Sequence, residues 1–218
     1  MSAFTWPPEL PASASAAASA EADQPGPGAG APSPASPPEG EGEQIPAAVL
    51  VALFIAGDPA EPHVVLTRRR ADLRRHAGEI SFPGGRRDAE DADLMITALR
   101  EAEEEIGLPR TQVSMLGELP ATSTLATRYT IHPFVGQIPA GVAWRLSARE
   151  VDAVLELPLS EVRAGARKVA IERRGITFQV DAYVVAEHVI WGATARILAH
   201  LFERLAPAAD SDGRLALA

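Results

Sequence analysis

The sequence contains no cysteine, so a disulfide framework and any metal site built from thiolates are excluded. It also contains no apolar run approaching the roughly 20 residues that a helix needs to cross a bilayer. Basic residues are the minority charge, with 20 Lys and Arg against 29 Asp and Glu, which gives a formal net charge of −9. This balance argues against a general nucleic-acid or anionic-membrane partner, because such binding requires a basic surface. It remains compatible with a local basic patch.

Residues 1–46 have no Lys or Arg, but they hold 10 of the 19 prolines and six acidic residues. Such a segment buries too little apolar surface to offset its chain entropy, so we predict a disordered tail. A signal or transit peptide needs basic residues near its start, and this tail has none. We therefore expect a cytoplasmic protein. The tail is interpreted as a solvated extension, with a partner-binding arm as the alternative.

The remaining chain is predicted to form one domain over residues 47–206, followed by a short C-terminal tail, 207–218. Strand-like runs occur at 47–55, 63–67, 113–119, 130–138, 153–157, 168–172 and 176–186. Only two segments have a helical pattern, 91–106 and 192–205. Many strands with few helices predict an α/β or α+β fold, arranged as a sandwich with a mixed sheet.

The first predicted helix carries a cluster of acidic residues. At about 100° per residue, Glu101, Glu104 and Glu105 share one face. Arg100 and Glu103 are expected on the far side. The apolar stripe consists of Met95, Ala98, Leu99, Ala102 and Ile106. The acidic face therefore borders the stripe that is expected to pack on the core.

Glu101 is followed by like charges three and four residues later, and each such pair costs a few tenths of a kcal/mol. The cluster also lies near the helix C-terminus, where the helix dipole disfavours anions; Gly107 occupies the expected C-cap position. A hard divalent cation such as Mg²⁺ would relieve both costs, and it prefers carboxylate oxygens. Taken alone, the run is more typical of a solvated helix face than of a metal site.

Two further features lie before this helix. A glycine pair, Gly84–Gly85, allows positive φ and a close approach of the backbone to a ligand. Upstream are five arginines within eight residues: Arg68, Arg69, Arg70, Arg74 and Arg75. The guanidinium group is a planar fork suited to phosphate. The alternative is a solvated basic loop; RNA binding is disfavoured because no aromatic residues interleave with the arginines.

Taken together, the pattern from Gly85 through Asp91 to Arg100-Glu-Ala-Glu-Glu-Glu-Ile-Gly-Leu108 resembles the Nudix box. Members of that family hydrolyse nucleoside diphosphates linked to another group, using Mg²⁺ or Mn²⁺. Two positions depart from the usual box. One extra residue separates the first glycine from the arginine, and Asp91 stands where Glu is usual. Neither departure affects the three helix glutamates.

The resemblance implies a Nudix-type α/β/α sandwich and a role for each matching residue. Glu101 and Glu105 would be primary metal ligands, with Glu104 as a third ligand or one that binds through water. A backbone carbonyl of the Gly84–Gly85 turn would complete the shell. Arg100 would hold helix and loop together by ion pairing. For the general base, Glu104 and Glu150 are both candidates, although an ordinary loop acid is the favoured interpretation of Glu150.

The segment Leu66–Gly85 is similar to the signature of coenzyme A pyrophosphatases within this family. Its matching positions are Thr67, Arg69, Arg74, Gly78 and 82–85. Boxes with the extra residue are common in that subgroup, whereas Arg70 departs from the usual small residue. The resemblance implies a nucleotide substrate like coenzyme A, bound by Arg69, Arg74, Gly78, Gly84 and Gly85, and cleavage to 3′,5′-ADP and 4′-phosphopantetheine.

Two other functions remain open. One is a Nudix hydrolase acting on another nucleoside diphosphate, such as NADH or ADP-ribose. The other is a non-catalytic nucleotide sensor, which is disfavoured because such proteins usually lose box glutamates and gain a DNA-binding domain. The oligomeric state stays open between monomer and homodimer. His76, in the signature loop, and Tyr129 are possible pocket residues.

Overall fold

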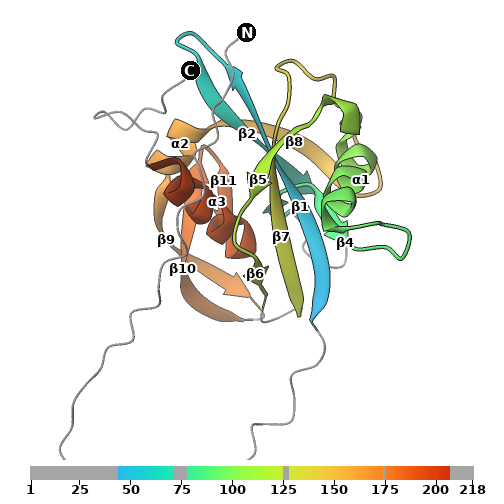
Figure 1. The fold of residues 1–218 in the computed structure, drawn as a ribbon. Coiled ribbons are helices and arrows are strands. Elements are labelled where there is room, and N and C mark those ends of the chain that lie inside the picture. Colours follow the sequence, from blue (N-terminus) through green and yellow to red (C-terminus); the bar gives the residue numbers. More distant parts are fainter. Residues whose placement is uncertain (1–43, 71–77, 125–127, 174, 207–218) are drawn as a thin grey trace, which may run out of the picture.

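The computed structural model describes residues 44–70, 78–124, 128–173 and 175–206 (Figure 1). Its strands are β1 (Ile45–Ala56), β2 (Glu61–Arg69), β3 (Ile80–Ser81), β4 (Gly84–Arg86), β5 (Ser114–Glu118), β6 (Thr122–Ser123), β7 (Tyr129–Gln137), β8 (Val151–Pro158), β9 (Ala166–Arg173), β10 (Ile176–Val185) and β11 (His188–Trp191). The helices are α1 (Leu94–Ile106), the 3₁₀ turn η1 (Arg110–Gln112), α2 (Leu159–Ala164) and α3 (Gly192–Leu205). The predicted fold class is confirmed.

The main sheet is mixed because β1 pairs in parallel with β7 and antiparallel with β2. Only the last four residues of β1 pair with β2, from Leu53 opposite Val64 to Ala56 opposite Glu61. The first half pairs with β4 instead, where Val49 lies opposite Gly84. β8 runs antiparallel to β2 along most of its length. The glycine pair is therefore part of the sheet, held against the backbone of β1.

The side chains of β1 alternate between the two faces of the sheet and so supply two cores. Those facing α1 are Ala48, Leu50, Ala52 and Phe54, which cluster with Ala98, Ala102 and Ile106 of the helix. Those on the other face include Val51 and Leu53, which cluster with Leu198 and Leu201 of α3. α1 thus packs on one face of the sheet, and α3 with the smaller β9–β11 sheet packs on the other (Figure 1).

Of the two predicted ends of α1, the first was three residues too early and the second was correct. The helix begins at Leu94 rather than at residue 91, because the Asp93 side chain accepts the Ile96 N–H at 2.8 Å and acts as the N-cap. At the other end Gly107 has φ 69°, and its N–H bonds back to the last turn, which confirms the C-cap glycine.

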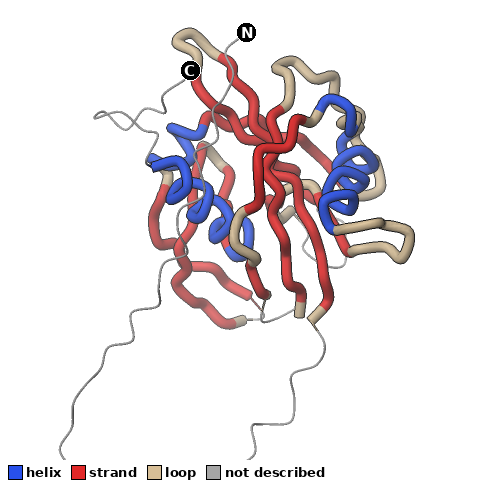
Figure 2. The backbone as a smooth tube through the Cα atoms, viewed as in Figure 1, coloured by secondary structure: helices blue, strands red, loops and turns tan. Residues whose placement is uncertain are grey.

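Several short elements were not predicted: β3, β4, β6, β11 and α2 (Figure 2). β3, β4, β6 and β11 have two to four residues and α2 has six, too few for a hydrophobic period to be recognised. β1 begins at Ile45, before the predicted domain start at residue 47. In the part of the chain that the structure describes, no helix is long and apolar enough to cross a membrane.

Candidate functional site

Glu101 and Glu105 lie one helical turn apart on α1 and face the glycine pair. Glu105 is only 5% exposed, and its Oε2 accepts the Gly84 N–H at 3.3 Å. A Cβ atom added to Gly85 would lie 2.4 Å from Oε1 of Glu101. A side chain at position 85 would therefore displace the Glu101 carboxylate, whereas at Gly84, which has φ 156°, an added Cβ would collide with the backbone of β1 at Ala48 and Val49. We refer to the carboxylates of Glu101 and Glu105, together with the backbone of Gly84–Gly85 that they face, as the cradle.

Both carboxylates are electrostatically strained in the absence of a cation. Burial, reinforced by the charge of Glu101, raises the pKa of Glu105 to about 8. The Gly84 N–H and the more distant Arg69 offset only part of this. Burial also raises the pKa of Glu101, although Arg100 opposes the shift. Glu105 therefore favours its protonated form at neutral pH, and a positive charge placed beside it would favour the carboxylate.

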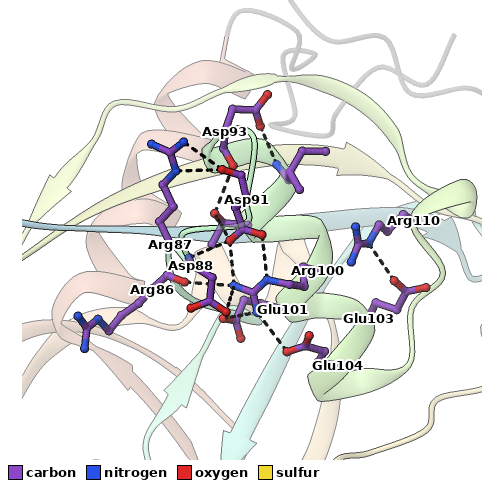
Figure 3. Close-up of polar contacts among 12 residues, drawn as sticks. Arg86, Arg87, Asp88, Asp91, Asp93, Arg100, Glu101, Glu103, Glu104 and Arg110 are labelled. Atoms are coloured by element: carbon purple, nitrogen blue, oxygen red, sulfur yellow. Dashed lines mark hydrogen bonds and ion pairs between the residues drawn. The ribbon is translucent and has the colours of Figure 1, made fainter.

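Arg100 connects the helix to the preceding loop (Figure 3). Its Nε and Nη2 donate to the two carboxylate oxygens of Asp91, each at 3.0 Å. Its Nη1 contacts Glu101 at 3.0 Å and Glu104 at 3.1 Å, and Nη2 also donates to the Arg86 carbonyl at 3.2 Å. The expectation that Arg100 lies on the far side was wrong, because its long side chain folds along the helix toward Glu104, four residues ahead.

Asp91 is 5% exposed and fully bonded. Besides Arg100, it accepts the Thr97 hydroxyl at 2.9 Å and the Asp88 N–H at 3.0 Å. These bonds, above all those from Arg100, hold the pKa of Asp91 well below its usual range. The carboxylate therefore stays ionised and holds the loop between β4 and α1 against the helix.

Arg69, at the end of β2, connects the site with the loop that contains Glu150. Its Nη1 lies 3.8 Å from Oε1 of Glu105, and its Nη2 lies 3.9 Å from Oε2 of Glu150. The neighbouring Arg70 donates to the Ala148 carbonyl at 2.6 Å, and the Ser147 N–H donates to the Glu105 carbonyl at 2.8 Å. The loop that ends at Glu150 is thus held beside α1. The charge of Glu150 contributes to the raised pKa of both helix glutamates.

The other predicted site residues are placed differently. The Glu104 side chain is 61% exposed and is bonded to Arg100, so it lies at the rim rather than in the cradle. Gly78 has φ 70° with open space around it, which makes glycine a conformational requirement there. Arg74 and His76 lie outside the described residues. The role of Arg70 as an anchor for the 148–150 loop was not foreseen, since its partner is a backbone carbonyl distant in sequence.

The residues of the cradle fit a divalent cation. The donor set consists of carboxylate oxygens, which Mg²⁺ and Mn²⁺ both accept. Glu101 is already paired with Arg100 at 3.0 Å, whereas the buried Glu105 has only the longer contact with Arg69, at 3.8 Å, among the ion pairs of the described residues. Within the described residues no three acidic or His side chains already converge as a metal cage. Glu101 and Glu104 are instead turned toward Arg100.

Comparisons with known proteins agree with this arrangement. Residues 45–176 match the model of the NUDIX domain. A protein of Yersinia pestis (strain Pestoides F) named as an uncharacterized Nudix hydrolase, NudL, is 38% identical over 161 residues, covering 73% of this chain and 79% of its own. Its counterpart in Yersinia pseudotuberculosis serotype O:1b is equally similar. A MutT/nudix family protein from Enterococcus faecalis has the same fold, with a TM-score of 0.52 and 14% identity over 78% of this chain and 64% of its own.

Replacing Asp91 by Asn is expected to destabilise the protein by about 2 kcal/mol, because it removes the buried, doubly bonded carboxylate from Arg100 and leaves it with Glu101 and the more exposed Glu104. The matched control is Asp93→Asn, which keeps a side-chain oxygen at the N-cap and should cost less than about 0.5 kcal/mol. Urea unfolding of both variants in EDTA measures the difference. Equal free energies of unfolding would show that the Asp91–Arg100 contact is not a principal support of the site.

In EDTA the free energy of unfolding should fall as the pH rises from about 5 to 8. The native state holds a proton on Glu105 that the unfolded chain, with its ordinary carboxyl pKa, has already released, so raising the pH favours unfolding. The Glu105→Gln variant should lose at least about 1 kcal/mol of this dependence. Thermal unfolding across this pH range tests it, with saturating Mg²⁺ expected to flatten the wild-type curve. If the free energy of unfolding of Glu105→Gln depended on pH as steeply as that of the wild type, Glu105 would not be the group with the raised pKa.

Proposed function

Because the chain belongs to the NUDIX domain family and is a Nudix hydrolase, we propose that it hydrolyses the diphosphate bond of coenzyme A or a derivative, using Mg²⁺ or Mn²⁺. The observation that carries this proposal is the buried Glu105 beside the partly buried Glu101, both against Gly84–Gly85, with Arg69 no closer to Glu105 than 3.8 Å. Such a cradle is suited to a cation shared with a diphosphate. The coenzyme A assignment rests on the signature-like segment Leu66–Gly85.

Glu101 and Glu105 would hold the cation, with Glu104 reaching it directly or through water after leaving Arg100. The bound cation would neutralise diphosphate charge and acidify the attacking water. Arg100 is proposed as a positioning residue, since its contacts are with Asp91 and the helix acids. Arg69 is proposed to move from its long contacts with Glu105 and Glu150 toward a phosphate oxygen, which its planar fork suits.

We assign the general base to Glu150 rather than Glu104. Glu150 lies across Arg69 from Glu105, so it faces the cradle from a different element. Glu104 is held by Arg100 at the rim. In the proposed step Glu150 accepts a proton from water while the water oxygen forms a new P–O bond and the bridging P–O bond breaks. One water is consumed, the leaving phosphate oxygen keeps the electron pair, and the proton on Glu150 passes to solvent.

Product analysis by chromatography tests the substrate assignment. The purified protein, with Mg²⁺ or with Mn²⁺, is given coenzyme A, 3′-dephospho-coenzyme A, NADH and ADP-ribose. We expect 3′,5′-ADP from coenzyme A, at a kcat/KM at least about tenfold above the other substrates. Glu105→Gln should abolish turnover, whereas Glu103→Gln, on the exposed side of α1, should not. Preferred cleavage of ADP-ribose or NADH would keep the family and refute the coenzyme A assignment.

The Glu150→Gln variant should lose about 10²–10⁴-fold in kcat with little change in KM, because the amide cannot take a proton from water. The acidic limb of the pH–kcat profile should disappear with it. Glu104→Gln, the rival base, should retain that limb. Steady-state kinetics across pH on both variants decides the assignment, and loss of the limb in Glu104→Gln alone would transfer the role to Glu104.

A further inference from the structure

The Glu150 side chain is only loosely held by its own contacts. It is 49% exposed, and its ion pair with Arg69 is long, at 3.9 Å between Oε2 and Nη2. An exposed pair of this kind contributes little to fixing a side chain in one place. The position of the Glu150 carboxylate near the cradle therefore depends on how the backbone of residues 147–151 is held.

One side of this turn is bonded to α1. The Ser147 N–H donates at 2.8 Å to the carbonyl of Glu105, which is among the last carbonyls of the helix and so needs a partner outside it. The Ser147 carbonyl in turn accepts the N–H groups of Glu150 and Val151, each at 3.0 Å. The turn that ends at Glu150 is thus bonded to the backbone of a cradle residue.

The other side of the turn is bonded to Arg70, which follows the last residue of β2. The Arg70 N–H donates to the Glu150 carbonyl at 3.1 Å, and its Nη1 donates to the Ala148 carbonyl at 2.6 Å. These two carbonyls lie on either side of Arg149. One residue therefore holds the backbone at Glu150 itself and two positions before it.

A β-bulge in β8 brings Glu150 opposite Arg70. Arg68 and Arg69 are consecutive in β2, but their partners in β8 are two residues apart, so Asp152 between those partners is an extra residue. The Asp152 carboxylate accepts Nε of Arg68 at 3.0 Å and Nη2 at 2.7 Å. Without the extra residue the register would shift by one, and Glu150 would no longer lie opposite Arg70.

We propose that Arg70 is a positioning residue for the reaction. Its bonds to the carbonyls of Ala148 and Glu150 keep the turn in the arrangement that places the Glu150 carboxylate near the cradle. This inference rests on the proposed function, in which Glu150 accepts the proton of the attacking water. In this role Arg70 does not touch the substrate, so its loss impairs the chemical step and leaves substrate binding unchanged. A small displacement of a reacting group can cost on the order of 10²-fold in rate.

The Arg70→Ala variant keeps the backbone N–H and removes the side-chain bond to Ala148. On the fastest of the four substrates of the product analysis, we expect kcat to fall at least about tenfold, with KM within about twofold of wild type. Its affinity for Mn²⁺ should stay within about twofold, because both cradle carboxylates remain. The control is Arg149→Ala, which removes the same charge from an exposed side chain that has no hydrogen bond or ion pair with another described residue. It should match wild type.

The double variant of Arg70→Ala with Glu150→Gln tests whether Arg70 acts through Glu150. Its kcat should lie within about twofold of that of Glu150→Gln alone, since a displaced turn then has no base to misplace. If the two losses instead multiplied, Arg70 would act independently of Glu150, and the inference would be overturned.

Three results would overturn the inference while leaving the reaction and its base in place: wild-type kinetics in Arg70→Ala, a raised KM at unchanged kcat, or a weakened affinity for Mn²⁺. A raised KM would make Arg70 a substrate contact, and weakened Mn²⁺ binding would make it a support of the cradle. An unimpaired Glu150→Gln variant would refute the base assignment and this inference together. Failure of the wild-type enzyme to cleave any of the four substrates would refute the proposed function itself.

Discussion

The ion pair between Arg100 and Asp91 is the contact on which the site depends. Two hydrogen bonds at 3.0 Å fix the guanidinium to a carboxylate that is only 5% exposed. The same guanidinium bonds to the Arg86 carbonyl and to Glu101 and Glu104. One side chain therefore fixes the distance between β4, the loop and α1. The packing of Ala98, Ala102 and Ile106 on β1 and the bond from the Gly84 N–H to Glu105 also contribute to the position of α1.

That rigidity brings together groups that repel each other. Glu101 and Glu105 are held one turn apart near the negative end of the helix dipole, where burial raises the pKa of both and the charge of Glu101 raises the pKa of Glu105 further. A solvated helix face would relax by turning its acids outward, as Glu103 and Glu104 do. Glu105 instead points inward against Gly84 and is nearly inaccessible. We propose that a bound divalent cation would relieve this repulsion, which would connect the architecture to the metal-dependent chemistry of the family.

The sequence predicted the parts of this arrangement that follow from local rules. The 3.6-residue period located α1, its acidic face and the glycine cap at Gly107, and the long strands were recognised from their apolar runs. Other features depend on contacts that no local pattern encodes. Arg100 was placed on the wrong side because a wheel projects Cα positions and not the reach of a long side chain. β1 pairs with β2 only near its end, and β4 pairs with an earlier part of β1. This pairing could not be predicted, because the three residues of β4 are too few to show a strand pattern. Glu150 is held near Glu105 by contacts of its loop with Arg69 and Arg70. These arginines precede the 148–150 loop by more than 75 residues, so no local pattern could reveal the contacts.

The most direct test of the account is the binding of Mn²⁺, followed by electron paramagnetic resonance, to the wild-type protein and to Glu105→Gln and Glu103→Gln. The account predicts saturable binding to wild type and to Glu103→Gln, and at least about a tenfold loss of affinity in Glu105→Gln, since only that variant removes a carboxylate from the cradle. Equal affinities in all three proteins would contradict it, because the buried glutamates would then have a role other than holding a cation.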